Sequence, residues 1–305
     1  MWKFTNKIKD YITYFKFITK HCKKLRINIE SNCTKKHFNV AATIIVKNEK
    51  KYMREWIEYH RLIGIEHFFI YDNESNDGLR DLLEPYINQG IVSYAYVKGS
   101  KMQMPCYEDS TKRNRNKVKW MAFLDADEFI NLHTNQTISD FLVSYESFSG
   151  IGVNWISFDS DNHDSMPNNG FVISNYTQCY LNPKDYGPNR HIKSIVKTKH
   201  IRCFHSPHLP EISRSFRKNH YLVTESFEKI SGPLTENSTQ KIQINHYFSK
   251  SKEEYLKKLK RGRADDGSMR KVNKSDYAFD EGTLTHCPPP SLLSILQERI
   301  EDTYS

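Results

Sequence analysis

The spacing of hydrophobic residues changes near residue 40. Between Phe4 and Leu25, apolar residues recur at alternating intervals of four and three, which is the period of one helix face, and most lysines fall on the other faces. Beyond residue 40, short apolar runs alternate with longer amphipathic segments. The pattern predicts an N-terminal amphipathic helix, a linker over residues 27–37, and then a domain that mixes strands and helices.

The mixed region contains five apolar runs that predict buried strands, separated by amphipathic segments that predict helices. Gly64 and Gly90 directly follow two of the helical segments, where glycine commonly ends a helix. Strands alternating with helices of this length imply right-handed crossovers and an α/β fold, with a doubly wound, mostly parallel sheet covered by helices on both faces. The predicted strands span residues 40–46, 67–71, 91–97, 120–124 and 151–158, and the predicted helices span residues 51–63, 79–89, 106–119 and 137–148.

Polar residues follow three of these strands at the point where each strand ends. They are Lys47-Asn48-Glu49, Asp72-Asn73-Glu74 and Asp125-Ala126-Asp127. In open α/β sheets, ligands bind outside the carboxyl ends of the strands. The three groups therefore predict a polar binding site at one edge of the sheet.

The third group belongs to the segment KWMAFLDADEF, residues 119–129, in which three acids directly follow an apolar strand. Two carboxylates spaced as Asp125 and Asp127 reach a single Mg²⁺ or Mn²⁺ ion, and such ions commonly bridge to substrate phosphates. A D-x-D pattern is a weak signal on its own, and the alternative is a solvated turn at the end of a strand. A basic run precedes the segment, and it either neutralises a nucleotide diphosphate or forms a solvated helix face: Lys112, Arg113, Arg115, Lys117 and Lys119.

The positive charge of the chain is concentrated at its N-terminus. The formal net charge is +9, and residues 1–38 hold ten basic and two acidic residues, a net +8. The near-neutral remainder argues against a nucleic-acid partner. A basic amphipathic helix with aromatic residues suits an anionic membrane surface, so we expect peripheral membrane contact through residues 1–30. The alternative is a helix that packs on the domain and has a solvated basic back.

The six cysteines are widely spaced and include no C-x-x-C pair. This spacing predicts neither a disulfide framework nor a zinc knuckle, and it favours a reducing compartment. No stretch approaches the roughly 18 consecutive apolar residues of a membrane span, and lysines interrupt the apolar region that a signal peptide needs. The cysteines are Cys22, Cys33, Cys106, Cys179, Cys203 and Cys287.

The order of these features resembles that of nucleotide-sugar glycosyltransferases of the GT-A type, and more narrowly glycosyltransferase family 92 and its bacterial family-2-like relatives. The similarity covers about residues 40–265 in the family order. It implies a GT-A-like, Rossmann-like domain over residues 39–270, preceded by the basic segment 1–38 and followed by a tail, residues 271–305, with a short helix from Ser291. The matching stretches are VKNEKKYMREWIEYHRLIGIEHFFIYDNESNDG, KRNRNKVKWMAFLDADEFI, HIKSIVK and INHYFSKSKEEYLKKLKRGRA.

The resemblance also implies roles for single residues. Asp72 takes the position that recognises the uracil ring of the donor, with Glu49 at the same end of the pocket. Asp127 takes the position of the metal-binding carboxylate, and His246 matches a histidine that often completes the metal's coordination. Without the resemblance, His246 is better interpreted as a core histidine. The implied residues are Asn48, Glu49, Asp72, Arg113, Lys117, Asp125 and Arg261 for the donor and Asp125, Asp127 and His246 for the metal.

Three of the implied donor residues are basic. Arg113 and Lys117 take positions that contact the donor's ribose or diphosphate. Arg261 either closes over the diphosphate or is a surface charge.

The catalytic base is the least defined residue of the site. Inverting transfer needs a carboxylate that takes a proton from the acceptor hydroxyl, while the metal stabilises the departing diphosphate. Asp159, Asp161 and Glu211 are the candidates, and each alone is more simply a loop carboxylate. Asp159 also stands where the family commonly has glycine. A polar pocket is expected as well, and its residues, which match no tetrahedral zinc spacing, are His191, Lys193, His205 and His208.

The sequence thus predicts an enzyme that moves a hexose from a UDP-sugar, UDP-galactose by resemblance, to a glycan or glycolipid, using Mn²⁺ or Mg²⁺ and inverting the anomeric carbon. We expect it at the cytoplasmic face of a bacterial membrane, in surface polysaccharide or lipooligosaccharide biosynthesis. One alternative is a haloacid-dehalogenase-like phosphatase, but Phe129 stands where that class usually has Thr or Val, and no GDxxxD follows. The other alternative is a basic membrane- or nucleic-acid-binding adaptor.

Overall fold

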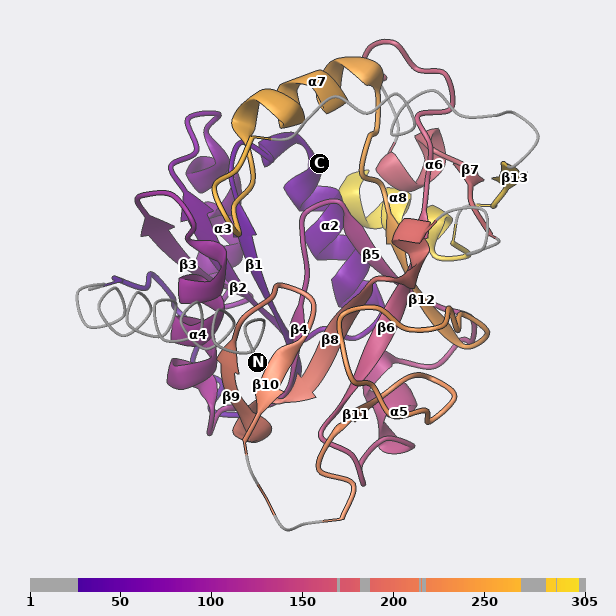
Figure 1. Ribbon diagram of the computed structural model, residues 1–305. Helices are drawn as coiled ribbons and strands as arrows, with labels where there is room; N and C mark the ends of the chain where they lie inside the picture. Colours follow the sequence, from indigo (N-terminus) through magenta and orange to yellow (C-terminus); the bar gives the residue numbers. More distant parts are fainter. Residues whose placement is uncertain are drawn as a thin grey trace, which may run out of the picture.

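The computed structural model describes residues 27–168, 171–181, 187–213, 215, 218–269, 284–288 and 290–301. The predicted N-terminal helix lies outside these residues. The described part of the chain folds around a mixed nine-stranded sheet with helices on both faces (Figure 1), which confirms the expected doubly wound α/β architecture. Among the described helices, none is both long enough and apolar enough to cross a membrane.

The first half of the domain is built from β1 (Phe38–Val46), α2 (Lys50–Leu62), β2 (His67–Asn73), α3 (Leu79–Asn88), β3 (Val92–Val97), α4 (Gln103–Asn114) and β4 (Val118–Phe123). Its strands are parallel and lie in the order β3-β2-β1-β4. β1 and β2 are buried along almost their whole length, as strands covered on both faces are. The ends of these four strands agree with the sequence prediction to within two residues.

The second half adds β5 (Glu128–Leu132), α5 (Ile138–Val143), β6 (Gly150–Ser157), α6 (Val172–Asn175), β7 (Gln178–Cys179), β8 (Ile192–Lys197), β9 (Ile201–Phe204), β10 (Pro210–Ile212), β11 (Leu222–Val223), β12 (Ile242–His246), α7 (Lys252–Arg261), β13 (Thr285–His286) and α8 (Leu293–Glu301), with 3₁₀ turns at Gly187–Arg190 and Thr198–His200. The sheet continues from β4 through β8, β6 and β12 to β5. β8 is antiparallel to both of its neighbours, and β5 is antiparallel to β12. The sequence predicts β6 but not β5, β8 or β12, and α5 is shorter than expected.

Hydrophobic cores lie on both faces of the sheet. Along β2, Phe68 and Ile70 belong to the core shared with α2, α3 and α5, whereas Phe69 and Tyr71 belong to the core shared with α4. This alternation follows from the two-residue period of a strand whose two faces are both covered. The sheet is therefore fixed from both sides, and α7 lies across the end at which the parallel strands terminate (Figure 1).

The C-terminal tail is attached to the domain at two points. α8 packs on α2, with Leu296 fully buried and Arg299 Nε 2.6 Å from Glu58 Oε2, which confirms the predicted short helix. Cys179 and Cys287 form a disulfide beside the pairing of β7 with β13. The cysteine spacing predicts no disulfide framework, and this prediction is wrong for Cys179 and Cys287. Because 108 residues separate the two cysteines, their spacing gives no sign of the bond.

The predicted linker, residues 27–37, contacts the edge strand β3. Glu30 and Tyr94 exchange two backbone hydrogen bonds of 2.8 and 2.9 Å. Arg80 Nη2 lies 2.6 Å from the Glu30 carboxylate and holds the segment from the side. The linker therefore covers part of the outer edge of the sheet.

Candidate active site

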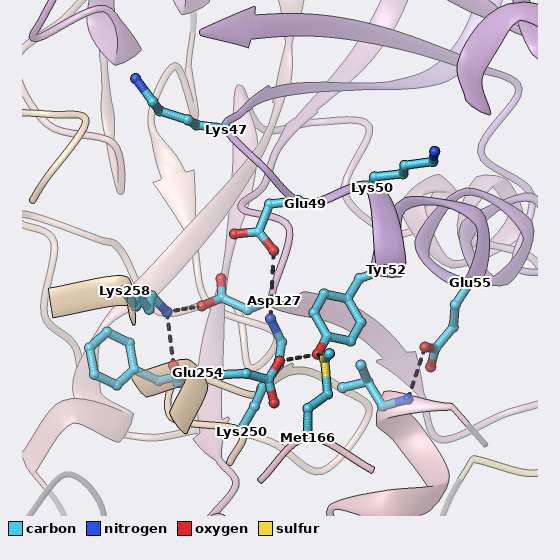
Figure 2. Close-up of polar contacts among 12 residues, drawn as sticks. Lys47, Glu49, Lys50, Tyr52, Glu55, Asp127, Met166, Lys250, Glu254 and Lys258 are labelled. Carbon is cyan, nitrogen blue, oxygen red and sulfur yellow. Dashed lines mark hydrogen bonds and ion pairs between the residues drawn. The ribbon is translucent and has the colours of Figure 1, made fainter. Parts of the chain in front are cut away.

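A cleft opens at the carboxyl edge of the sheet. Because β1, β2 and β4 are parallel, their carboxyl ends deliver Glu49, Glu74 and Asp127 to the same place, as the sequence predicts. The cavity measures about 400 Å³, and residues of α7 and the segment after it form one of its walls. Figure 2 shows Glu49 and Asp127 with the lysines that approach their carboxylates.

Asp127 is held in its ionised form. It is buried, its Oδ2 accepts a hydrogen bond from Lys258 Nζ, and the same oxygen lies 3.7 Å from His246 Nε2. Burial opposes ionisation, but the Lys258 ammonium outweighs it and holds the pKa of Asp127 well below its usual range. The cleft therefore contains a permanent carboxylate beside a cation.

His246 reaches Asp127 because of strand register. β12 pairs with β5 so that His246 lies opposite Glu128, and the next residue, Tyr247, donates its backbone N–H to the Asp127 carbonyl at 2.8 Å. The His246 ring lies against Trp155, with ring centroids 4.1 Å apart. Burial lowers the pKa of His246 to about 3, so the imidazole is neutral. A neutral imidazole beside a carboxylate has the chemistry of a divalent-metal ligand pair.

Asp125 is the counter-ion of a buried lysine. Lys193, only 1% exposed, places Nζ 2.8 Å from Asp125 Oδ2 and 3.3 Å from Glu128 Oε2. Gln103 Nε2 donates to Asp125 Oδ1 at 2.8 Å. Burial alone would lower the pKa of Lys193, but the two carboxylates raise it well above its usual range. Both oxygens of Asp125 contact protein groups, and its implied sharing of one metal with Asp127 stays a prediction.

Glu128, the third acid of the KWMAFLDADEF segment, is fully buried. Burial raises the pKa of Glu128 to about 8, and the charges of Asp125 and Asp127 act in the same direction. Glu128 Oε2 accepts the backbone N–H of Asp125 at 2.8 Å, while Oε1 has no hydrogen-bond partner among the described residues. The three acids therefore share two lysines: Asp127 pairs with Lys258, and Asp125 and Glu128 both lie beside Lys193.

The loops after β1 and β2 are tied to each other and to α7. Arg261 Nη1 on α7 lies 2.7 Å from Glu49 Oε1. Arg261 was expected either at the diphosphate or on the surface, and it lines the cleft. Asn48 adopts a left-handed backbone with φ of 56°. Its N–H donates to Ser75 Oγ at 2.9 Å, and its side-chain oxygen accepts the N–H of Asn76 at 2.8 Å. Asn48 thus ties the loop after β1 to the loop after β2, and the Arg261–Glu49 ion pair ties α7 to the loop after β1.

The model of glycosyltransferase family 92 matches residues 37–277, a range that includes the main sheet and the residues that line this cleft. The chain belongs to glycosyltransferase family 92. Curated relatives include a family 92 protein of Oryza sativa subsp. japonica, Os08g0121900, which is 32% identical over 53% of this chain and 27% of its own length. The family 92 protein RCOM_0530710 of Ricinus communis is 27% identical over 80% of this chain and 42% of its own length.

A third relative carries a named activity. The galactan beta-1,4-galactosyltransferase GALS3 of Arabidopsis thaliana is 32% identical over 107 residues, which are 32% of this chain and 21% of the relative. The family 92 chain spans less than half the length of each of these three relatives.

Solved structures with some likeness to the family 92 chain include two nucleotide complexes. S. aureus TarS 1-349 in complex with UDP is 15% identical, with a TM-score of 0.37 over 53% of this chain and 47% of that one. Glucosyl-3-phosphoglycerate synthase from Mycobacterium tuberculosis, in complex with Mn²⁺, UDP and glucosyl-3-phosphoglycerate, is 13% identical, with a TM-score of 0.26 over 38% of this chain and 44% of that one. Scores this low transfer no residue role to the family 92 chain.

Asp72 of the family 92 chain is buried behind the cleft wall, with 2% of its surface exposed. Its Oδ2 accepts a hydrogen bond from the Tyr94 hydroxyl, and its Oδ1 accepts the N–H of Ser75, both at 2.8 Å. The next two residues, Asn73 and Glu74, line the cleft instead. Both carboxylate oxygens of Asp72 therefore accept internal hydrogen bonds, and its implied contact with a uracil ring stays a prediction.

Arg113 and Lys117 do not line the cleft of this family 92 chain, so the structure gives no support to their implied contacts with the ribose or diphosphate. Arg113 Nε lies 2.7 Å from Asp109 Oδ2, and its Nη2 donates to the Ile27 carbonyl at 3.0 Å. Lys117 precedes β4, whose six residues at about 3.3 Å each place it roughly 20 Å from the carboxyl edge. Sequence proximity to Asp125 misleads here because a whole strand separates them.

None of the three candidate bases lines the cleft. Asp161 accepts three hydrogen bonds, from the N–H and hydroxyl of Thr177 and the N–H of Gln178, at 2.7, 2.9 and 2.9 Å, so it braces a loop. Asp159 is buried close to Asp161 in the sequence. Glu211 lies on β10, where its carboxylate contacts Arg202 and His205. The structure therefore places none of the three candidate bases in the cleft, and a catalytic role for any of them stays a prediction. The carboxylates that do line the cleft are Glu49, Glu74, Asp125, Asp127 and Asp265.

Sequence reasoning placed Lys193 in a polar pocket without pairing it with an acid, and it missed Lys258. Lys193 lies in HIKSIVK and Lys258 in the basic helix after INHYF, both within stretches that carry the family resemblance. The signal that points to them is the requirement that buried carboxylates have partners. The histidines of the expected polar pocket lie in two places. The rings of His191 and His208 lie 5.0 Å apart beside Trp155, whereas His205 contacts Glu211.

A second, larger cavity adjoins the cleft. It measures about 1010 Å³ and shares Glu49, Lys258 and Arg261 with the cleft. Figure 2 shows its interior, where the Tyr52 hydroxyl donates to Glu254 and Lys250 Nζ lies 4.0 Å from the centre of the Tyr52 ring. Its cationic lining residues outnumber the acidic ones; they are Lys47, Lys50, Lys51, Arg54, Lys250, Lys257, Lys258, Lys260 and Arg261 against Glu49, Glu55, Asp77 and Glu254.

Proposed function

We propose that this family 92 chain is a glycosyltransferase that moves a hexose, galactose, from UDP to a glycan acceptor. The observation that carries the proposal is the pairing of ionised Asp127 with neutral His246 and Lys258 in the cleft at the carboxyl edge. Galactose as the sugar is supported by the activity for which the Arabidopsis relative is named, and that relative matches only part of this chain.

Asp127 and His246 are the residues that would hold a Mn²⁺ or Mg²⁺ ion. Their ligand atoms lie 3.7 Å apart, one is a carboxylate oxygen and the other belongs to a neutral imidazole, so the donor set fits such an ion. When bound, the ion supplies positive charge to the departing diphosphate. Lys258 competes with it for Asp127, and on release its ammonium is available to the same diphosphate.

Further cations surround the proposed diphosphate position. Lys47, Lys101, Arg261 and Arg263 all line the cleft and come from four different loops or helix ends. Guanidinium and ammonium groups bind phosphate oxygens through charge-assisted hydrogen bonds. We therefore assign these residues to orienting the donor.

The second cavity is the proposed acceptor site, because it opens onto the cleft and is large enough for a sugar chain. Its excess of lysines favours an acceptor that carries negative charge, such as a glycan with uronate or phosphate groups. Glu49 lies where the two cavities meet, and it is the carboxylate best placed to approach an acceptor hydroxyl.

The phosphatase alternative loses support from the same geometry. Its nucleophile would be Asp125, whose two oxygens are occupied by Lys193 and Gln103. A nucleophilic carboxylate needs a free oxygen that faces the substrate.

The donor proposal is tested by calorimetric titration of the protein with UDP-galactose and UDP-glucose, with and without Mn²⁺. We expect Mn²⁺-dependent binding of one sugar nucleotide, and at least tenfold weaker binding, about 1.4 kcal/mol, for Asp127→Asn. The matched control is Asp164→Asn, because the Asp164 side chain is 90% exposed. Equal binding by Asp127→Asn and the control would refute the donor site.

The acceptor proposal is tested by transfer to acidic and neutral oligosaccharides of the same length. Replacing Lys51 and Lys260 by Gln should raise the KM for the acidic acceptor about tenfold, since each removed charge weakens attraction in the second cavity, and leave hydrolysis of the UDP-sugar unchanged. Lys218→Gln with Lys229→Gln, outside both cavities, is the control. A preference for neutral acceptors that neither pair of substitutions alters would contradict it.

A further inference from the structure

The hairpin of β9 and β10 stands apart from the main sheet and yet helps to form the cleft. It is a separate two-stranded sheet, and it is anchored by Phe204, whose ring lies 5.4 Å from that of Tyr107 and 4.6 Å from that of Phe123. The loop between its strands carries Pro207 and His208, which line the cleft. The loop is also tied to β8, because Ser194 Oγ donates to the His208 carbonyl at 2.5 Å.

Strand geometry brings three potential metal ligands together on one face of this hairpin. Cys203 on β9 is the direct cross-strand partner of Glu211 on β10. His205 follows Cys203 by two residues, which returns it to the same face. The Cys203 Sγ lies 3.4 Å from His205 Nε2 and 3.3 Å from Glu211 Oε2, and the last two atoms lie 3.0 Å apart.

These separations match one face of a zinc tetrahedron. A thiolate at about 2.3 Å from zinc and imidazole and carboxylate ligands at about 2.0–2.1 Å are mutually separated by roughly 3.3–3.6 Å when the site is tetrahedral. The three atoms are therefore within a few tenths of an ångström of that arrangement. His205 and Glu211 keep 32% and 30% of their side-chain surface exposed, so water can reach the fourth position.

The carboxylate is oriented by a neighbouring cation. Arg202 Nη1 lies 2.5 Å from Glu211 Oε1, which leaves Oε2 directed at Cys203 and His205. Metal-binding carboxylates commonly have such an outer partner, which fixes the ligand oxygen. The backbone N–H of Phe204, between the two other ligands, donates to Glu108 Oε1 at 3.1 Å and holds that part of β9 in place.

We propose that Cys203, His205 and Glu211 bind a zinc ion, with water as the fourth ligand, and that this ion fastens the loop that lines the cleft. A borderline-soft ion is favoured because the set combines thiolate, imidazole and carboxylate. The site is separate from the proposed donor metal at Asp127 and His246, and it does not depend on the proposed function. It also differs from zinc motifs based on C-x-x-C, because the strand pairing rather than the sequence spacing assembles it.

The test is a titration of the full-length, metal-free protein, with the Cys179–Cys287 disulfide intact, with Co²⁺, followed by Zn²⁺. We expect one equivalent of Co²⁺ with the thiolate-to-cobalt charge-transfer band and tetrahedral ligand-field bands, all displaced by Zn²⁺. Cys203→Ser should abolish the charge-transfer band, while Cys33→Ser, at another free cysteine, should keep it. Asp127→Asn should also keep it, which separates this site from the donor metal.

Two further variants guard against a simple folding defect. Arg202→Ala leaves all three ligands in place and should weaken Co²⁺ binding about 10- to 100-fold. Zinc should raise the Tm of the wild-type protein relative to chelator and leave the Tm of Glu211→Gln unchanged. A wild-type protein without the charge-transfer band, a band that survives Cys203→Ser, or a Tm that zinc does not alter would overturn the proposal.

Discussion

Single residues set the charge of the cleft through partners that lie far away in sequence. Lys193 is 68 residues from Asp125, and Lys258 is 131 residues from Asp127. Lys193, Lys258 and Asp127 are largely buried, whereas the Asp125 side chain keeps 35% of its surface exposed. Removing one partner of such a pair leaves an uncompensated charge in a poorly solvated place.

Lys193→Met is the clearest test of this coupling. The methionine fills similar space but leaves Asp125 and Glu128 without a cation, so the free energy of unfolding should fall by about 3–5 kcal/mol. Urea denaturation measures the change. Lys197→Met, on the same strand but paired with the more exposed Glu146, should cost no more than about 1 kcal/mol. Equal losses in the two variants would show that Lys193 contributes only through packing.

Asp159 predicts a pH dependence of stability. Burial raises its pKa from 3.8 to about 6, so between these values the folded chain holds a proton that the unfolded chain has released. The contribution of Asp159 to stability therefore falls as pH rises through this window and is constant above it. Asp159→Asn should flatten that fall by about 1 kcal/mol, as measured by denaturation at several pH values. An unchanged slope would mean that Asp159 titrates normally.

At the scale of elements, α8 completes the core from outside the region that matches the family model. Leu296 is fully buried against it, whereas its neighbour Ile295 is 48% exposed. Leu296→Ala should lower the free energy of unfolding by about 2–4 kcal/mol, because it removes buried methyl groups and leaves a cavity. Ile295→Ala should change it by less than about 1 kcal/mol. Thermal denaturation compares the two, and similar Tm values would contradict the packing of α8.

Apolar pattern predicted the first half of the fold because β1 to β4 are covered on both faces and read as continuous hydrophobic runs. β12 escaped prediction because Gln243, Asn245 and His246 give it the composition of a loop. These side chains are buried and bonded to one another or face the site, as with Gln243 Nε2 and Asn245 Oδ1 at 2.6 Å.

The candidate site, like the fold, was predictable only in part. The convergence of acids at one edge follows from parallel topology and was predictable. The choice of His246 as the neighbour of Asp127 depends on the antiparallel register of β12 with β5, which only the assembled sheet defines; the sequence suggested it solely by resemblance.

At the scale of the whole molecule, charge and fold are segregated. The basic segment, residues 1–38, holds nearly all of the net charge, and the predicted contact of residues 1–30 with an anionic membrane stays a prediction. Deleting residues 1–26 should abolish salt-sensitive binding to anionic vesicles and leave the folded domain intact. Vesicle co-sedimentation measures this, with neutral vesicles as the control. Undiminished binding after the deletion would refute a membrane role for the segment.

The backbone pairing of Glu30 with Tyr94 makes the end point of such a deletion important. β3 is an outer strand, and an uncovered outer strand offers its free N–H and C=O groups to another chain, which is a common route to aggregation. The bridge at Glu30 occupies part of that edge from within the same molecule. A deletion that stops at residue 26 keeps Glu30 on this edge. A deletion that extends beyond residue 30 uncovers the edge, so it would lower the solubility of the protein as well as its charge.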